Sequence, residues 1–286
     1  MNKWVAGARP RTLPAAIAPV IVGTALFARS DLPFNWINAA LALAVSLLLQ
    51  IAVNYANDYS DGVRGTDEVR VGPVRLTASG LASAKAVKSA AYLTFLLAAI
   101  CGAYLAFRTS WVLIIVGAIA IIAAWGYTGT SKPYGYMGFG ELSVFLFFGV
   151  VATMGSYFVQ SEQVSGKAFL VSIPMGSLSC AILAINNLRD RPKDADVGKK
   201  TLAVRLGDIR ARIFFTLLLL SAHIAALLAG FISPWALFTL ALLPVSYSIA
   251  KRVLKGAVGK DLIPLLGKTG RLQMLFALLL SLAFII

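Results

Sequence analysis

Charged residues are scarce in this sequence. Asp, Glu, Lys and Arg make up 13% of the chain and hydrophobic residues 59%, whereas a soluble domain is roughly a quarter charged. This composition excludes a soluble enzyme and indicates an integral membrane protein with most of its mass in the bilayer. The 286 residues have room for eight or nine spans of about 20 residues each. We therefore expect a single transmembrane domain over residues 1–286.

Cysteine and histidine are nearly absent. Cys101 and Cys180 both lie inside apolar runs, where a cysteine behaves as a small buried hydrophobe, and two such residues make neither a disulfide framework nor a metal site. His223 stands alone among apolar residues, so we expect a packed core histidine rather than a catalytic base. Chemistry in this chain must therefore come from other side chains.

Long apolar runs predict an all-α, polytopic membrane protein with nine transmembrane helices. Pro14 and Pro19 interrupt the first run, which is tolerated in a membrane helix where neighbours satisfy the freed backbone groups. The chain start lacks a small-residue cleavage site, so we expect this run to be retained rather than removed as a signal peptide. The predicted spans are 12–28, 36–56, 87–107, 111–128, 139–159, 168–187, 213–231, 235–253 and 270–286.

The basic residues predict the orientation. Of the 26 Lys and Arg residues, all but Arg29, Arg108 and Lys167 fall on the side that carries the N-terminus. Because cytoplasmic loops are enriched in Lys and Arg, we expect a cytoplasmic N-terminus, an external C-terminus and location in the cell membrane. The basic face is suited to anionic lipid headgroups, and a nucleic-acid partner is not expected.

Two polar clusters follow directly on long apolar runs. The first contains Asn54, Asp58 and Asp61, and the second contains Asn187, Asp190 and Asp194. Carboxylates at the end of a membrane helix are costly unless they are paired, hydrated or bound to metal, and they indicate function by default. Both clusters fall on the predicted cytoplasmic side, after spans that run in the same direction. We therefore expect them to form one site.

The spacing of these acids favours a divalent metal. Asp58 and Asp61 are three residues apart and Asp190 and Asp194 four apart, so each pair shares a helical face if its helix continues. Pro192 disfavours a regular helix through the second pair. Mg²⁺ prefers oxygen ligands and is typically held by one or two carboxylates plus substrate phosphates. The four aspartates are thus the predicted metal ligands, with Asn54 and Asn187 in support.

Basic residues surround both clusters. Guanidinium and ammonium groups are suited to phosphate oxygens, and the bases near the clusters on this side are Arg64, Arg70, Arg75, Lys132, Arg189, Lys199 and Lys200. Any one of them can instead be an ordinary cytoplasmic topology charge. Lys132 lies in a loop rich in glycine and tyrosine that begins at Tyr127, which has the composition of a lid or pocket edge, although a tight turn with interfacial tyrosines is also compatible.

A diphosphate held at the cytoplasmic face of an apolar bundle implies a lipid tail in the bilayer. A polyprenyl diphosphate is the natural substrate, and its ionisation would give an allylic cation that needs shielding from water. Aromatic faces near the clusters are suited to such a cation. The candidates are Tyr55, Tyr59, Trp125, Tyr127 and Tyr134, most of which we expect to be structural.

The two clusters resemble known motifs. Asn57-Asp58-x-x-Asp61 with a further Asp67, and Asp190-x-x-x-Asp194, are similar to the two aspartate-rich motifs of the UbiA-type intramembrane prenyltransferases. The resemblance covers nearly the whole chain. The segments 58–75, 127–141 and 186–207 look most like the branch that acts on 1,4-dihydroxy-2-naphthoate. Many superfamily members place the last acid of the first motif closer to Asp61 and have Asp where this chain has Asn187.

The resemblance implies a Mg²⁺-dependent reaction in menaquinone biosynthesis. A polyprenyl group would pass from polyprenyl diphosphate to the ring carbon of 1,4-dihydroxy-2-naphthoate that bears the carboxylate, with loss of CO₂ and diphosphate. It implies that Asp58, Asp61, Asp190 and Asp194 hold Mg²⁺, and that Arg64, Lys132 and Lys199 bind the diphosphate. Because CO₂ leaves in place of a proton, no strong base at the ring carbon is expected.

Two alternatives remain open from the residues. A related enzyme could prenylate another acceptor, such as 4-hydroxybenzoate, homogentisate, haem or a glycerol phosphate. A transporter for a divalent cation or organic anion would also place carboxylates in membrane helices. Transport sites lie near the bilayer midplane, however, whereas both clusters here fall on one face. The residue pattern therefore favours catalysis at a lipid diphosphate.

Overall fold

The computed structural model describes residues 2–65 and 75–286, and the described part of the chain is helical with no strand. The order begins with α1 (Lys3–Ala8), η1 (Pro10–Thr12), α2 (Pro14–Ala28), α3 (Trp36–Val63), α4 (Ala84–Arg108), α5 (Val112–Gly126), η2 (Tyr134–Met137), α6 (Gly140–Val144), η3 (Phe145–Val151) and α7 (Ala152–Ser161). It continues with α8 (Gly166–Asp196), α9 (Leu202–Ala229), η4 (Pro234–Leu242), α10 (Leu243–Leu254), η5 (Gly259–Asp261) and α11 (Leu262–Ile285). The predicted all-α class is confirmed.

Each of the nine predicted spans coincides with a helical segment, but not all have full membrane length. Within the described ranges, seven helices are long and apolar enough to cross a membrane, or up to eight if the bent pair Lys3–Thr12 and Pro14–Ala28 counts as one span. The helix α5 has 15 residues, which gives about 22 Å at 1.5 Å per residue, against a hydrocarbon core of about 30 Å.

Polar side chains set where the long helices begin. The side chain of Asn35 accepts from the backbone N–H groups of Ile37 and Asn38 at the start of α3. Ser83 and Ser165 cap α4 and α8 in the same way. These bonds satisfy N–H groups that have no partner inside the helix, which matters most at the edge of an apolar medium.

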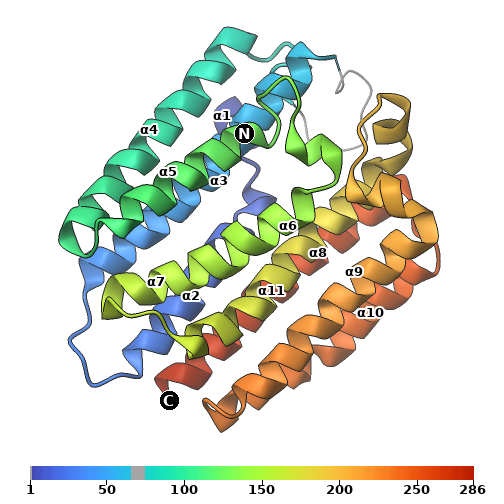
Figure 1. Ribbon diagram of the computed structural model, residues 1–286. Coiled ribbons are helices and arrows are strands. Elements are labelled where there is room, and N and C mark those ends of the chain that lie inside the picture. Colours follow the sequence, from blue (N-terminus) through green and yellow to red (C-terminus); the bar gives the residue numbers. More distant parts are fainter. Residues whose placement is uncertain (1, 66–74) are drawn as a thin grey trace.

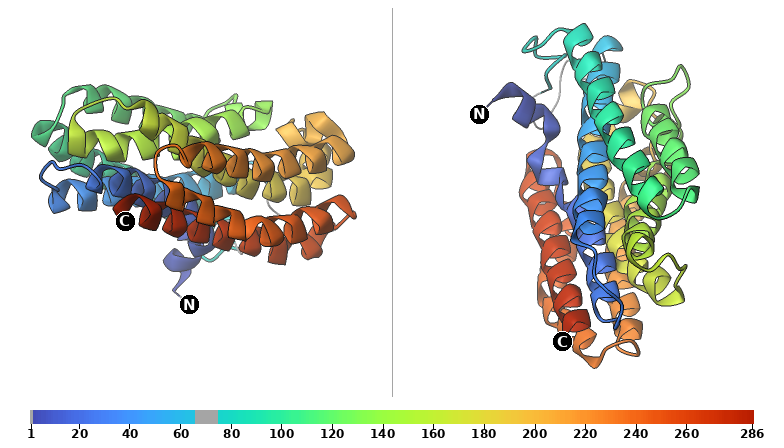
Figure 2. Two further views of the ribbon diagram at one scale, coloured as in Figure 1. Left: turned by 90° about the horizontal axis from the view of Figure 1, so that it is seen from below. Right: turned by 90° about the vertical axis from the view of Figure 1, so that its left-hand side faces the viewer.

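The long helices run roughly side by side, and α8 lies in the middle of the bundle (Figures 1 and 2). It packs against α9, α11, α2 and the stretch from α6 to α7. In its most apolar stretch 78% of residues are buried, against 22% in α3. The outer helices instead expose apolar residues such as Ile115 and Ile122 on α5 and Leu217 on α9, as expected for helices that face lipid.

A close glycine contact brings the middle of the α6–η3–α7 segment onto α8. A Cβ added at Gly149 would lie 2.5 Å from the Cα of Gly176, so a side chain at this position would push the two backbones apart. Small residues allow this close approach between membrane helices. Gly149 lies in η3, which is a π-helical turn, and such turns are frequent near functional sites.

Candidate active site

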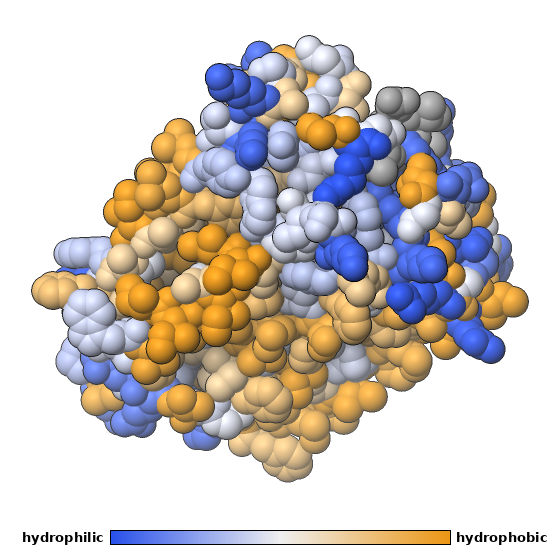
Figure 3. Space-filling view, turned by 45° about the horizontal axis from the view of Figure 1, so that its top comes forward, coloured by the Kyte–Doolittle hydropathy of each residue, from blue (hydrophilic) through white to orange (hydrophobic). Residues whose placement is uncertain are grey.

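A large cavity opens among α2, α3, α5, the α6–α7 stretch and α8. Its volume is about 700 Å³. One end is lined by the charged residues Asp61, Arg75, Asp190, Asp194 and Lys199, and the remainder by apolar residues that reach Leu113 and Val159. Figure 3 shows hydrophilic residues gathered over the upper part of the molecule and hydrophobic residues over the broad part below it. This shape is suited to a molecule with a charged head and a long apolar tail.

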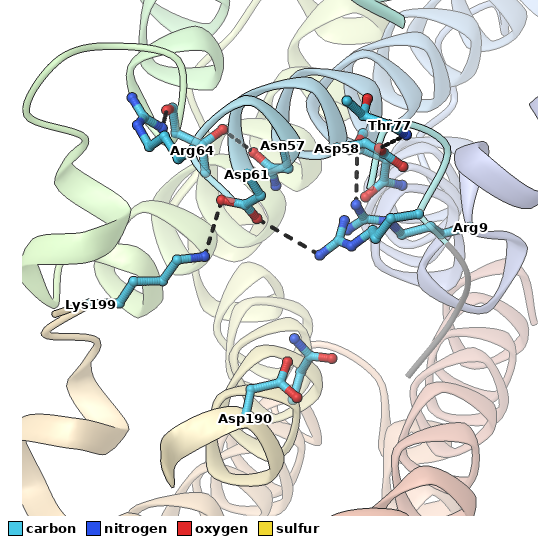
Figure 4. A network of polar contacts seen from close by, with 12 residues as sticks. Arg9, Asn57, Asp58, Asp61, Arg64, Thr77, Asp190 and Lys199 are labelled. Atoms are coloured by element: carbon cyan, nitrogen blue, oxygen red, sulfur yellow. Dashed lines mark hydrogen bonds and ion pairs between the residues drawn. The ribbon is translucent and has the colours of Figure 1, made fainter. Parts of the chain in front are cut away.

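Asp61 is the first motif's carboxylate in this cavity. It is 5% exposed, and its oxygens lie 3.1 Å from Lys199 Nζ and 3.9 Å from Arg75 Nη2. The hydroxyl of Tyr136 also donates to it. Figure 4 shows Asp61 pointing from α3 toward the side where Lys199 and Asp190 lie. The positively charged side chains of Lys199 and Arg75 therefore lie beside this carboxylate, where they could also bind an anionic ligand.

Lys199 holds its charge at this position. Burial lowers the pKa of its ammonium group, but Asp61, with Tyr136 and Asp194, outweighs burial and raises the pKa above the ordinary value. The Nζ atom also lies 4.5 Å from the centre of the Tyr136 ring. The backbone N–H of Lys199 donates to the carbonyl of Asp194 at 2.7 Å. These contacts keep a positive charge next to both motifs.

Asp58 has a different environment from Asp61. It is fully buried, it is not among the residues that line the cavity, and its two oxygens accept from the backbone N–H groups of Leu76 and Thr77 at 2.9 and 3.0 Å. Figure 4 shows the side chain directed toward Thr77. The carboxylate thus holds the chain segment that leads into α4, and its predicted metal role stays a prediction.

The amides of the first motif also join separate segments. Asn54 Nδ2 donates to the carbonyl of Ala8 at 2.9 Å and to Thr12 Oγ1 at 3.2 Å. Asn57 Oδ1 accepts from Thr128 Oγ1 at 2.6 Å. Asn54 and Asn57 both line the cavity. Asn54 therefore anchors the N-terminal segment, and Asn57 lies beside the glycine- and tyrosine-rich loop.

The second motif lies on one unbroken helix. We expected Pro192 to disfavour a regular helix, but α8 continues to Asp196, and that expectation was wrong. The proline is exposed and lies in the last turns, where its missing N–H and its ring disturb few buried contacts. Asp190 and Asp194 thus share a helical face, and both line the cavity together with Asn187. Asp190 is paired with Arg189 Nε at 2.7 Å.

Two of the predicted diphosphate-binding bases lie outside the cavity lining. Arg64 donates to the carbonyls of Thr128 and Thr130, so it clamps the loop that follows Tyr127. Lys132 is exposed and borders a shallower recess formed with Gly198, Lys200 and Arg205. Tyr127 does line the cavity. Asp67, the further acid of the first motif, and Arg70, one of the nearby bases, lie outside the described residues.

Sequence reasoning missed Arg9 and named Arg75 only as one of several nearby bases, and both line the cavity. Arg9 has a positive φ of 52°, rare for a side chain with Cβ, and donates from Nη2 to the carbonyl of Asn54 at 3.2 Å. Nothing in its local sequence signals this position. His223 is buried, as expected for a packed core histidine, and bonds Ser246 at 2.8 Å, whereas Cys180 is buried and Cys101 only partly so.

The cavity residues fit a divalent cation shared with a substrate. Among the described residues no three histidine, cysteine or carboxylate groups form a metal site by themselves. Asp61 on α3 and Asp190 and Asp194 on α8 line the same cavity. Mg²⁺ completes its octahedral shell with water and phosphate oxygens where protein carboxylates are few. The donor set is therefore appropriate for Mg²⁺ bound together with a diphosphate.

Comparison with known proteins gives consistent matches. The model of the UbiA prenyltransferase family matches residues 16–285. A 1,4-dihydroxy-2-naphthoate octaprenyltransferase of Mycobacterium tuberculosis is 49% identical over 96% of this chain and 94% of that protein. The Escherichia coli protein of the same description is 36% identical over 99% of this chain and 94% of its own length.

Solved structures share the fold. A UbiA homologue from Archaeoglobus fulgidus, solved with DMAPP and Mg²⁺, aligns with a TM-score of 0.72 over 99% of both chains at 17% identity. The same homologue with GPP and Mg²⁺ aligns with a TM-score of 0.73 at 16% identity. At this low sequence identity, the similarity shows that this chain and the homologue share the same arrangement of helices, and no more.

Proposed function

Because this chain belongs to the UbiA prenyltransferase family, we propose that it transfers a polyprenyl group from polyprenyl diphosphate to 1,4-dihydroxy-2-naphthoate. The reaction releases CO₂ and diphosphate and gives demethylmenaquinol, a step of menaquinone biosynthesis. The observation that carries this proposal is the 49% identity, over nearly the full length, to a mycobacterial protein of that activity. The cavity supports it, because one end is charged and the rest is apolar.

The charged end is the proposed diphosphate site. Asp61 on α3 and Asp190 and Asp194 on α8 would hold Mg²⁺, with the amide oxygens of Asn57 and Asn187 as neutral ligands. Mg²⁺ supplies charge neutralisation for the departing diphosphate. We assign Asp58 to holding Leu76 and Thr77, since both of its oxygens accept backbone N–H groups.

Cationic side chains would bind the rest of the diphosphate. Lys199 and Arg75 stand beside Asp61, and Arg9 and Lys193 also line this end. An ammonium group offers a point charge and a guanidinium group a planar pair of donors. Arg64 and Lys132 would contribute indirectly, through the loop that follows Tyr127. Lys132 is part of this loop, and Arg64 donates to two of its carbonyls.

The apolar remainder of the cavity would hold the prenyl chain. Phe147, Phe148 and Val151 line it from η3, and Val116 and Ala120 line it from α5. Such a wall excludes water from the allylic carbon, which would otherwise be hydrolysed. Tyr127 also lines the cavity, and the π face of its ring would be suited to positive charge on that carbon.

Loss of CO₂ removes the need for a strong base. The new bond forms between the allylic carbon and the ring carbon that bears the carboxylate. The bond to the carboxylate then breaks, and its electron pair restores the aromatic ring. His223 is buried at 4% exposure against Ser246 on α10 and takes no part. The basic residues near Asp61 are the groups that would attract the acidic acceptor.

We place the polar end of the cavity at the cytoplasmic face of the cell membrane. The distribution of Lys and Arg supports a cytoplasmic N-terminus and an external C-terminus. This orientation requires nine crossings, with the short helix α5 among them and α1 at the surface. Residues 1–286 would then form a single catalytic unit that meets its lipid substrate from within the bilayer.

The test uses purified protein in lipid with Mg²⁺, a polyprenyl diphosphate and carboxyl-labelled 1,4-dihydroxy-2-naphthoate. Released CO₂ and the prenylated quinol are followed, with EDTA as the control. We expect label release that requires both Mg²⁺ and the prenyl donor. Prenylation of 4-hydroxybenzoate or homogentisate without label release would instead assign the chain to another acceptor.

A further inference from the structure

One buried carboxylate near the cavity has no role in the reaction described above. Glu141 lies in the first turn of α6, is 5% exposed, and is not among the residues that line the cavity. Its Oε1 accepts from Asn187 Nδ2 at 3.0 Å. Its Oε2 is buried with no hydrogen-bond partner among the described residues. A buried carboxylate is costly, so this one calls for an explanation.

The hydrogen bond fixes the direction of the Asn187 amide. The bonded oxygen of Glu141 acts as an acceptor, so Asn187 must offer its NH₂ group. The amide is planar, and its carbonyl oxygen therefore points to the other side. Asn187 itself lines the cavity, so its carbonyl oxygen is the atom that it would offer to a ligand there. An NH₂ group in the same place would repel a cation.

Asn187 also lies in register with the acids of its helix. Asp190 and Asp194 follow it by three and seven residues, so all three share one face of α8. The first turn of α6 is held against α8 by a second contact, in which the Cys180 thiol donates to the backbone carbonyl of Glu141 at 3.0 Å. The oxygen of Asn187 is thus directed by a rigid neighbour.

We propose that Glu141 is a positioning residue that makes Asn187 an oxygen ligand for the divalent cation. The inference rests on the proposed function, since it takes a cation at the second motif as given. It also accounts for an amide at position 187. The neutral amide would contact the cation, and the carboxylate of Glu141 lies behind that amide, hydrogen-bonded to it. The two residues then carry one carboxylate and one amide between them.

The pair can be exchanged in a test. In Glu141→Gln the new side chain can both donate and accept, so Asn187 is free to turn its NH₂ group toward the cavity. In Asn187→Asp two carboxylates face each other. In the double variant Glu141→Gln/Asn187→Asp the new amide donates to a carboxylate that presents oxygen whichever way it turns. Glu162→Gln, at the exposed end of α7, is the matched control.

The measurement is binding of Mn²⁺, as a spectroscopic substitute for Mg²⁺, to the purified protein with a non-reactive prenyl diphosphate analogue. We expect Glu141→Gln to weaken Mn²⁺ affinity by about tenfold or more, as is usual when a residue that orients a ligand is changed. The double variant should restore affinity to within about twofold of the unsubstituted protein, and Glu162→Gln should leave it unchanged. Thermal unfolding in detergent reports separately on stability.

Unchanged Mn²⁺ affinity in Glu141→Gln would overturn the proposal. A double variant with Mn²⁺ affinity as low as that of Glu141→Gln would also overturn it, because the loss would then not depend on the orientation of the amide at position 187. Where Glu141→Gln does not fold, the double variant decides alone: affinity near that of the unsubstituted protein supports the proposal, and weak binding overturns it. Failure of the unsubstituted protein to bind Mn²⁺ would reject the metal site itself, whereas prenylation of a different acceptor would leave this inference standing.

Discussion

The two aspartate-rich motifs are similar in sequence and differ in what their side chains hold. On α3, Asn54 holds the N-terminal segment, Asn57 meets Thr128, and Asp58 holds Leu76 and Thr77. On α8, Arg189 binds its neighbour Asp190, and Asn187 is directed by Glu141. The first motif is therefore a junction between distant parts of the chain, and the second belongs mainly to one central helix. We therefore expect some substitutions in the first motif to lower stability and others to lower turnover, whereas substitutions in the second motif should mainly lower turnover.

The largest expected effect is at the carboxylates that face the cavity. Asp61→Asn and Asp190→Asn each remove a charge from the proposed Mg²⁺ site, and we expect turnover to fall by about 10²-fold or more, the range for losing one electrostatic contact in an active site. Turnover is measured in lipid, and thermal unfolding serves as the control for folding. Near-normal turnover by either variant would remove that residue from the metal site.

Asp58→Asn should act on stability instead. The substitution replaces one of two charged acceptors for backbone N–H groups in a fully buried position, and hydrogen bonds to a charged group contribute about 1.5–3 kcal/mol each. We expect a lower melting temperature, with turnover per folded molecule within a few-fold of normal. Normal stability combined with complete loss of turnover would return Asp58 to the metal site that the sequence predicts.

Lys199→Met tests the bridge between the two motifs. This ammonium group pairs with Asp61 and lies above the Tyr136 ring, and its raised pKa keeps it charged throughout the neutral range. We expect KM for the prenyl diphosphate to rise by about tenfold, the equivalent of roughly 1.4 kcal/mol, with a smaller change in kcat. Because folding raises the pKa, the ion pair should be lost only above the ordinary value of 10.5, so the KM difference should not vary between pH 6 and 8. A KM equal to that of the unsubstituted protein would mean that the Lys199 ammonium group only pairs with Asp61 and does not bind the diphosphate.

The smallest effect is expected at Lys132. It is exposed, and it borders the recess with Lys200 and Arg205 rather than the main cavity. We expect Lys132→Ala to change KM and kcat by less than about twofold, in line with other exposed surface substitutions. A tenfold rise in KM would show that the loop after Tyr127 brings this lysine to the diphosphate when substrate binds.

Several features of the site could be predicted from the sequence because they depend on local pattern. Carboxylates that follow long apolar runs mark a polar end of a membrane bundle, and Asp61, Asp190, Asp194, Asn187 and Lys199 do meet at one. Pro192 was misjudged, since a local rule about proline ignores that the last turns of α8 can tolerate it. Arg9 was missed, because its contact with Asn54 joins residues 45 positions apart.

The sequence by itself determined a helical membrane protein with two acidic motifs, since composition and the order of apolar runs decide which segments can enter a bilayer. Only the tertiary structure decided which acids face the cavity. Residues on a helix advance by about 100° each, so Asp58 and Asp61 lie some 60° apart, and a modest rotation of α3 would exchange their surroundings. That rotation is set by packing against α4 and the segments that Asn54 and Asp58 hold, and these contacts come from parts of the chain far from the motif.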